Sequence, residues 1–391
     1  MNPARSYLDH NATSPIRPAV LDAVTSALAR PANPSSVHAE GRAARASLER
    51  ARAQVAALVG AEPEWVIFTS GGTEANATAL RPGALLGRDG RPATFLLLPK
   101  VEHASVLRGH RFPAADVVEL GVTPDGVLDL ADLRLAIDAA RGEPLLLSVQ
   151  LANNETGVVQ PVADAAALVR AAGGAVHGDA VQACGRVPVD MVALGLDALT
   201  LSGHKLGGPP GTGALVVAGG RAGLDLPLLQ GGGQEGRFRA GTENVAGIVG
   251  FGIAAEAASR DLAAGVGRLR VLRDAAEREV LRLAPDAVVF GQAVERLPNT
   301  LAFAVPGLSA ETALMALDLD GVSVSSGSAC SSGKVVHSHV LAAMGVPGDL
   351  ARGAVRVSFG WNSCEADVEA FAKGFEILLR RLYERGRARA A

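Results

Sequence analysis

Short, continuously apolar runs alternate along this chain with longer stretches of helical periodicity. The apolar runs cover residues 66–69, 94–98, 145–149 and 198–201. Parallel strands that are buried on both faces have sequences of this kind. Between the runs, segments such as residues 43–59 and 131–141 repeat their apolar side chains at helical spacing. We therefore expect an α/β fold with a mostly parallel mixed sheet flanked by helices.

The length of 391 residues is sufficient for more than one domain. We expect a large domain over residues 15–260 and a smaller α/β domain made of residues 1–14 and 261–391. Residues 246–283 are rich in alanine, leucine and arginine, and we interpret them as the bridge out of the large domain. Because glycines interrupt this stretch, we predict more than one helix there.

Charge, hydropathy and cysteine content indicate which partners and which compartment to expect. The formal net charge is −3, so nothing in it favours nucleic acid or an anionic membrane as a partner. No apolar stretch is long enough to cross a bilayer, and the first 14 residues lack the apolar core of a signal peptide. Cys184, Cys330 and Cys364 are widely spaced and odd in number, which suits a reducing compartment. We expect a cytoplasmic protein.

Lys205 lies in a glycine-rich turn, within the run SGHKLGG of residues 202–208. A lysine amine can form a Schiff base with a carbonyl group, and the aldehyde of pyridoxal phosphate is the commonest partner in such a setting. Ser202 and His204 would then supply donors to the cofactor phosphate. The alternative is an ordinary surface lysine in a glycine turn.

Asp179 stands at the end of a short apolar strand, residues 175–179. A carboxylate there can keep the pyridine nitrogen of pyridoxal phosphate protonated, so that the ring accepts electrons. Gln182, three residues later, can bond the phenolic oxygen of the ring. An aspartate at a strand end is also a common helix N-cap, but its combination with Lys205 favours the cofactor role.

The chain resembles the pyridoxal-dependent cysteine desulfurases of the NifS and IscS group. The resemblance runs nearly end to end and rests on YLDHNAT (7–13), TSGGTEAN (69–76), EH (102–103), NNETG (153–157), HGDAVQ (177–182), SGHK (202–205), RAGT (239–242) and SSGSAC (325–330). The shared order of the motifs argues against chance. It implies the aminotransferase-like fold type I of pyridoxal phosphate enzymes. The implied reaction converts L-cysteine to L-alanine.

The resemblance also assigns cofactor-binding residues. Gly72 and Thr73 follow a strand and open a helix, where backbone amides can hold a phosphate, although a plain capped helix start has the same appearance. The resemblance implies that Thr242 reaches that phosphate from a partner subunit, and hence a homodimer with shared active sites. It also implies that His103 stacks on the pyridine ring and relays protons; without the resemblance, a structural histidine is the more common interpretation.

Three residues are candidates for binding the substrate. Arg356 alternates with apolar residues in a strand. It can bind an α-carboxylate through two parallel hydrogen bonds, or it can be a surface arginine. The resemblance favours the carboxylate role. Asn154 follows a buried strand and can reach either the ring oxygen of the cofactor or the substrate carboxylate. Asn33 is a fainter candidate for the same pocket.

Cys330 lies among serines and glycines, in residues 325–333. A thiol in such a stretch does not fill a core, unlike Cys184, and its thiolate form is a nucleophile. By resemblance, Cys330 takes the substrate sulfur as a persulfide. It then passes the sulfur to an acceptor, such as an iron–sulfur scaffold protein, for the assembly of iron–sulfur clusters or thio-cofactors.

Three functions are alternatives to cysteine desulfuration. An aminotransferase of the same fold would need no thiol at Cys330, whereas a selenocysteine lyase would use the same pocket. A cofactor-free sulfur carrier would have no need of Lys205, Asp179, Gln182 and His103 together.

His337 and His339 follow Cys330 closely, a grouping that can indicate a metal site. The set lacks a fourth ligand or paired spacing, so we expect no stable metal, with a transient iron–sulfur contact at Cys330 left open. Ser338 instead predicts a helix N-cap immediately before His339.

Two positions depart from the family pattern. Gly72 stands where alanine is common, which a backbone contact tolerates. Trp361, in Gly360-Trp361-Asn362, stands in a stretch that is more often Gly-Arg. The chain also ends soon after its last helix, which puts the docking of an iron–sulfur scaffold at a C-terminal extension in doubt.

Overall fold

A computed structural model describes residues 5–31, 33–219, 227–327 and 338–390, the last eight of these without their side chains. Cys330 and His337 lie outside the described residues.

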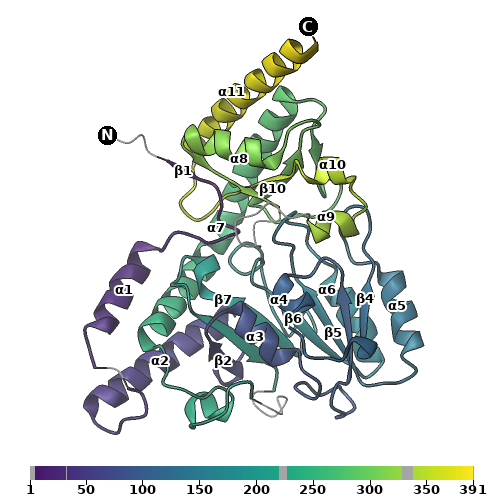
Figure 1. The fold of residues 1–391 in the computed structure, drawn as a ribbon. Helices are drawn as coiled ribbons and strands as arrows, with labels where there is room; N and C mark the ends of the chain where they lie inside the picture. Colours follow the sequence, from purple (N-terminus) through teal and green to yellow (C-terminus); the bar gives the residue numbers. More distant parts are fainter. Residues whose placement is uncertain (1–4, 32, 220–226, 328–337, 391) are drawn as a thin grey trace.

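A seven-stranded sheet forms the centre of the larger part of the molecule (Figure 1). Its strands follow the order β2-β8-β7-β6-β5-β3-β4. β8 runs antiparallel to β2 and β7, and the other neighbours are parallel, so the mostly parallel mixed sheet is confirmed. The strands are β2 (Val66–Thr69), β3 (Phe95–Pro99), β4 (Val117–Leu120), β5 (Leu145–Gln150), β6 (Ala175–Asp179), β7 (Ala198–Ser202) and β8 (Gly213–Val217).

Both faces of this sheet are covered by helices. In β5, Leu147 packs in one hydrophobic cluster with Val55 of α2, while the adjacent Leu146 packs in another with Val106 of α4. Successive side chains of a strand point to opposite faces, so the two clusters lie on the two sides of the sheet. The helices of this part are α1 (Pro18–Leu28), α2 (Ala39–Leu58), α3 (Gly72–Ala79), α4 (Ala104–Leu107), α5 (Leu130–Ala139) and α6 (Val162–Ala171).

One continuous helix, α7 (Val245–Leu283), links the two parts of the molecule (Figure 1). The prediction of more than one helix here is wrong. A Cβ on Gly250 would lie 2.6 Å from Val24 of α1, and one on Gly252 would lie 2.6 Å from Ala51 of α2. These glycines therefore allow three helices to pack closely, and that contact stabilises the helix that the glycines alone would weaken.

A second, smaller sheet has the strand order β12-β13-β10-β9, with all neighbours antiparallel. Its core joins Phe303 of β10 to Phe371 and Phe375 of α11, with ring centroids 6.3 and 5.5 Å from Phe303. The elements are β9 (Val288–Val289), β10 (Thr300–Ala304), α8 (Ala310–Leu319), β11 (Val322–Ser323), β12 (Ser325–Ser326), α9 (His339–Ala343), α10 (Gly348–Ala351), β13 (Val355–Ser358) and α11 (Glu365–Ala390).

The N-terminal arm returns to this smaller part. β1 (Ser6–Tyr7) pairs in parallel with β11, and Asp9 bridges to Ser358. At α9, the Ser338 hydroxyl accepts a hydrogen bond from the Leu341 amide at 3.0 Å, which confirms the predicted N-cap. The domain boundaries at residues 14/15 and 260/261 stay a prediction.

Within the described ranges, no helix combines the length and the apolar character that a membrane span requires. The same ranges hold no cluster of three histidine, cysteine or acidic side chains arranged for a metal ion.

Candidate active site

A cavity of about 240 Å³ opens at the carboxyl ends of β5, β6 and β7. Its wall includes the last residue of each strand: Gln150, Asp179 and Ser202. Ligands of open α/β sheets bind at this edge. Most of the predicted site residues line the cavity: Gly72, Thr73, His103, Asn154, Asp179, Gln182, Ser202, His204, Lys205 and Arg356.

The carboxylate of Asp179 is fixed in the cavity wall by two hydrogen bonds. Its Oδ1 accepts from the backbone N–H of Val181 at 3.0 Å, and its Oδ2 accepts from Asn76 Nδ2 at 2.9 Å. The residues after Asp179 form turns and no helix, so it is not a helix N-cap. β6 and α3 together hold this buried carboxylate in one orientation.

Lys205 lies in a turn of 3₁₀ helix, Gly203–Leu206, directly after β7. Its ammonium group donates hydrogen bonds to the backbone oxygens of Asn11 and Ala12, the latter at 2.7 Å. Gly207 ends the turn with a φ of +83°, a conformation that favours glycine. The N-terminal arm thus closes the cavity beside the lysine.

His103 is the N-cap of α4, and its ring is neutral. Its Nδ1 accepts a hydrogen bond from the backbone N–H of Ser105 at 3.1 Å, so the ring proton is on Nε2. Burial lowers the pKa of His103, and the nearby Asp179 only partly offsets this. The imidazole can therefore donate one N–H.

Arg356 reaches the cavity from β13 and is almost fully buried. Its Nη1 donates to the backbone oxygen of Asn154 at 3.0 Å, and its Nη2 lies 2.7 Å from Asp9 Oδ1. Its Nε is buried without a hydrogen-bond partner in the part of the chain that the structure describes. The guanidinium therefore keeps a donor that an anionic ligand can use.

Gly72 and Thr73 begin α3 immediately after β2. A Cβ on Gly72 would lie 3.0 Å from Val181 Cγ2 and 3.7 Å from Ser202 Cβ. Glycine therefore keeps this corner of the cavity open, next to the amide groups of a helix N-terminus, where anions bind favourably.

His204 lies in the same wall as a neutral imidazole. Burial lowers its pKa to about 4, helped by the positive charges of Lys205 and Arg186. Its Nδ1 lies 3.1 Å from the Thr13 hydroxyl.

Gln182 lines the cavity, but its amide group is engaged elsewhere. Nε2 donates to the backbone oxygen of Asn11 at 3.0 Å, and Oε1 accepts from Arg186. In this arrangement its side chain holds the N-terminal arm.

Two of the predicted site residues that the structure describes are not brought to the cavity by this single chain. Asn33 and Thr242 are exposed and absent from the cavity wall. The side chain of Asn33 accepts from the Ser35 amide at 2.9 Å. Cys330 lies outside the described residues.

Sequence reasoning missed several residues of the cavity wall. They are Asn11, Ala12, Asn76, Ser105, Gln150, Ala152 and Val181. Asn11 and Asn76 carried a signal, since each stands in a motif on which the resemblance rests.

Two buried carboxyl groups near the cavity were also missed. Burial raises the pKa of Glu155 to about 7, although the Ser338 hydroxyl donates to it at 2.6 Å and Arg356 lies near. Burial likewise raises the pKa of Glu102, whose Oε1 accepts a hydrogen bond from the backbone N–H of Gln150 at 2.6 Å. Both stand in predicted motifs, but no sequence pattern indicated their burial.

The donor set of the cavity fits pyridoxal phosphate. An amine, a carboxylate, a neutral imidazole and a helix N-terminus surround one space at the strand ends. Asn76 Oδ1 and Arg356 Nε are buried polar atoms without partners among the described residues, and a polar ligand in the cavity can supply partners.

Comparisons with known proteins agree with this geometry. Residues 6–371 match the aminotransferase class-V family. The "Cysteine desulfurase IscS" of Dictyoglomus turgidum is 39% identical over 96% of this chain and 95% of its own. The structure of a NifS-like protein from Rickettsia africae superposes with a TM-score of 0.86 at 33% identity, over 96% of this chain and 99% of the other. A structure titled "SspA in complex with cysteine" has a TM-score of 0.75 at 27% identity, over 90% and 98%. This chain belongs to the class-V aminotransferase family, in its group of NifS- and IscS-like cysteine desulfurases.

Proposed function

We propose that this protein is a pyridoxal phosphate-dependent cysteine desulfurase. It converts L-cysteine to L-alanine and passes the sulfur to Cys330 as a persulfide. The observation that carries the proposal is the meeting of Lys205, Asp179 and Arg356 in one cavity at the strand ends. The names of the relatives support the choice of substrate.

Separate parts of the cavity would hold the cofactor. Asp179 would bind the pyridine nitrogen and Lys205 the aldehyde, with His103 beside the ring. The start of α3 and neighbouring donors would bind the phosphate: Gly72, Thr73, Ser202 and His204. When bound, pyridoxal phosphate supplies an electron sink for the α-carbon of the amino acid.

The residues of the chain then bind and orient the substrate. The Arg356 guanidinium takes the α-carboxylate through two parallel hydrogen bonds, with Asn154 beside it and Asn33 as a further candidate. The Lys205 amine accepts the α-proton and returns it to form alanine.

The sulfur transfer involves Cys330. Its thiolate attacks the substrate sulfur, an S–S bond forms, and the C–S bond breaks with its electron pair left on the carbon fragment. The outer sulfur of this persulfide then passes to an acceptor protein that serves iron–sulfur cluster or thio-cofactor assembly, and the Cys330 thiolate is the leaving group.

We further propose a cytoplasmic homodimer in which the partner's Thr242 completes the phosphate site. The exposure of Thr242 in the single chain supports this arrangement. We expect cross-linking or sedimentation to detect a dimer. We also expect a Thr242→Ala variant to lose cofactor affinity.

The assignment of Lys205 is tested by borohydride reduction of the holoprotein followed by peptide mapping. The reduced cofactor adduct should be found on Lys205. An adduct on Lys100, Lys334 or Lys373 would refute the assignment.

The assignment of Cys330 is tested with a matched pair of variants. Cys330→Ala should retain the cofactor absorbance and lose both persulfide and sulfide release. Cys364→Ala is the control, since Cys364 is exposed and lies outside the cavity. A Cys330→Ala protein that still forms alanine and sulfide at the parent rate contradicts the proposal.

A further inference from the structure

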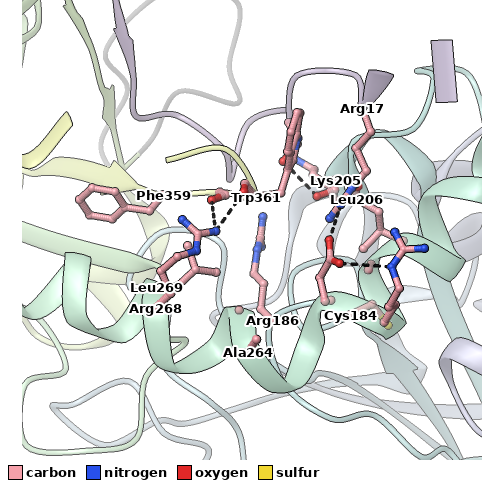
Figure 2. Close-up of a pocket in the computed structure, with 17 residues that line it drawn as sticks. Arg17, Cys184, Arg186, Lys205, Leu206, Ala264, Arg268, Leu269, Phe359 and Trp361 are labelled. Atoms are coloured by element: carbon pink, nitrogen blue, oxygen red, sulfur yellow. Dashed lines mark hydrogen bonds and ion pairs between the residues drawn. The ribbon is translucent and has the colours of Figure 1, made fainter. Parts of the chain in front are cut away.

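A second cavity, of about 360 Å³, lies against α7, and Lys205 lines both this cavity and the first. Four arginines line it, together with Lys205, and Asp261 is the single carboxylate among the described residues of its wall. Even without Lys205, the arginines exceed the carboxylates by three. Figure 2 shows Arg186 and Arg268 directed to the same side of α7 as Lys205 and Trp361.

Two of these arginines are bonded to neutral oxygens. Arg186 donates to the backbone oxygen and side-chain Oε1 of Gln182 and, at 3.1 Å, to the backbone oxygen of His10. Arg268 donates to three backbone oxygens, those of Gly360, Trp361 and Ser363, and Figure 2 draws part of this set as dashed lines from Arg268. Carbonyl oxygens orient a guanidinium but leave its charge uncompensated.

The remaining two arginines share one acid. Asp261 lies 2.6 Å from Arg17 Nη1 and 3.6 Å from the Nε of Arg260, which is largely exposed. Asp261 therefore neutralises at most one of the two positive charges.

The pKa values of Arg186 and of the neighbouring His10 are lowered, chiefly by burial. Burial lowers the pKa of Arg186 to about 9, and the charge of Arg356 contributes. Burial also lowers the pKa of His10 to about 3, with further contributions from Arg186 and Arg268. Only for His10 do arginines of this cavity add to the effect of burial.

Trp361 fixes the geometry of this cavity. Its indole N–H donates to the backbone oxygen of Pro15 at 2.9 Å, and the guanidinium of Arg17 lies 5.3 Å from its ring centroid. The departure from the Gly-Arg pattern at this position thus places an aromatic wall where it orients Arg17.

We propose that this cavity binds a small oxoanion, a phosphate or a carboxylate compound, between Arg17, Arg186 and Arg268. Guanidinium groups recognise both through paired N–H donors. An oxoanion held among them would supply the negative charge that the described residues of the wall lack.

The site can be tested by fluorescence, because the chain has only two tryptophans, Trp65 and Trp361. In a Trp65→Phe holoprotein, Trp361 is the sole indole. Inorganic phosphate and succinate are titrated separately at constant ionic strength, and calorimetry provides a second measurement. A saturable response to phosphate identifies a phosphate site and one to succinate a carboxylate site. No response to either in both measurements overturns the proposal.

A matched set of variants locates the binding. Ala264 lines the cavity on α7, four residues from both Arg260 and Arg268. Ala264→Glu places a carboxylate within reach of these arginines and should weaken oxoanion binding about tenfold or more. Ala264→Gln, similar in size but neutral, should weaken it less.

Ala263→Glu adds the same charge on an exposed position outside the cavity wall and should bind as the parent does. Equal binding by the Ala264→Glu, Ala264→Gln and parent proteins would place the oxoanion elsewhere and refute the site.

Discussion

Arg356 Nη2 lies 2.7 Å from Asp9 Oδ1, although the two residues are 347 positions apart in the chain. The arginine that we propose for the substrate carboxylate therefore already pairs with a carboxylate of the N-terminal arm. Both side chains are largely buried, with exposed fractions of 2% and 20%. Binding of the substrate then requires that one carboxylate shares the guanidinium with another or replaces it.

Replacing Asp9 with asparagine should strengthen substrate binding. The neutral amide still accepts a hydrogen bond from Arg356 but no longer competes by charge. We expect the KM for L-cysteine to fall about fivefold, which corresponds to about 1 kcal/mol. Steady-state alanine formation measures it, with Asp22→Asn, at an exposed site, as the charge control. An unchanged or raised KM would show that the two carboxylates do not compete.

Asp179→Asn tests the partner of the cofactor ring. The amide cannot hold the pyridine nitrogen in its protonated form, so the electron sink is weakened. The kcat should fall about 10²-fold, while the hydrogen bond from Asn76 keeps the side chain in place. The matched control is Asp197→Asn, because that carboxyl is absent from the cavity wall. Similar losses in the two variants would argue for a general effect on folding.

Glu155 should make the stability of the protein depend on pH. Burial raises its pKa from 4.5 to about 7 in the folded state, so the folded protein binds this proton more tightly than the unfolded chain. The stabilisation is complete below about pH 4.5 and is lost as the pH rises through about 7. Its full size is about 3 kcal/mol.

Urea unfolding at several pH values between 5 and 8 measures this contribution. Glu155→Gln should remove it, so the difference in unfolding free energy between the parent and the variant changes across this range. Ser338→Ala removes the hydrogen bond that opposes the shift and should move the transition to higher pH. Parallel pH profiles for the parent and Glu155→Gln would exclude the role of this carboxyl.

Much of the site followed from local sequence because of how parallel strands end. Asp179 and Ser202 end two neighbouring strands, so the residues that close these apolar runs meet at one edge of the sheet. The pairing of Arg356 with Asp9 could not be predicted, since it joins the two ends of the chain. The hydrogen bond from Gln182 to Asn11 could not be predicted either, because it joins residues 171 positions apart in the chain.

Besides long-range contacts, the burial of individual side chains could not be predicted from local sequence patterns. Glu155 and Glu102 stand in recognisable motifs, yet their raised pKa values come from the packing of distant elements around them. The prediction of more than one helix at α7 was wrong for the same reason, since it considered local sequence and not packing. The low helix propensity of the α7 glycines is a local property, whereas their use is a contact with α1 and α2.

Substitutions at two glycines of α7 can separate the effect of helix propensity from the effect of close packing. A Cβ on Gly252 would lie 2.6 Å from the Cα of Ala51, so Gly252→Ala should lower the free energy of unfolding by about 1–3 kcal/mol. A Cβ on Gly267 would meet no atom within 4 Å, and Gly267→Ala should raise it by up to about 1 kcal/mol. Urea unfolding of both variants at one pH measures the difference. Stabilisation by both substitutions would show that α2 does not pack on Gly252 as closely as described.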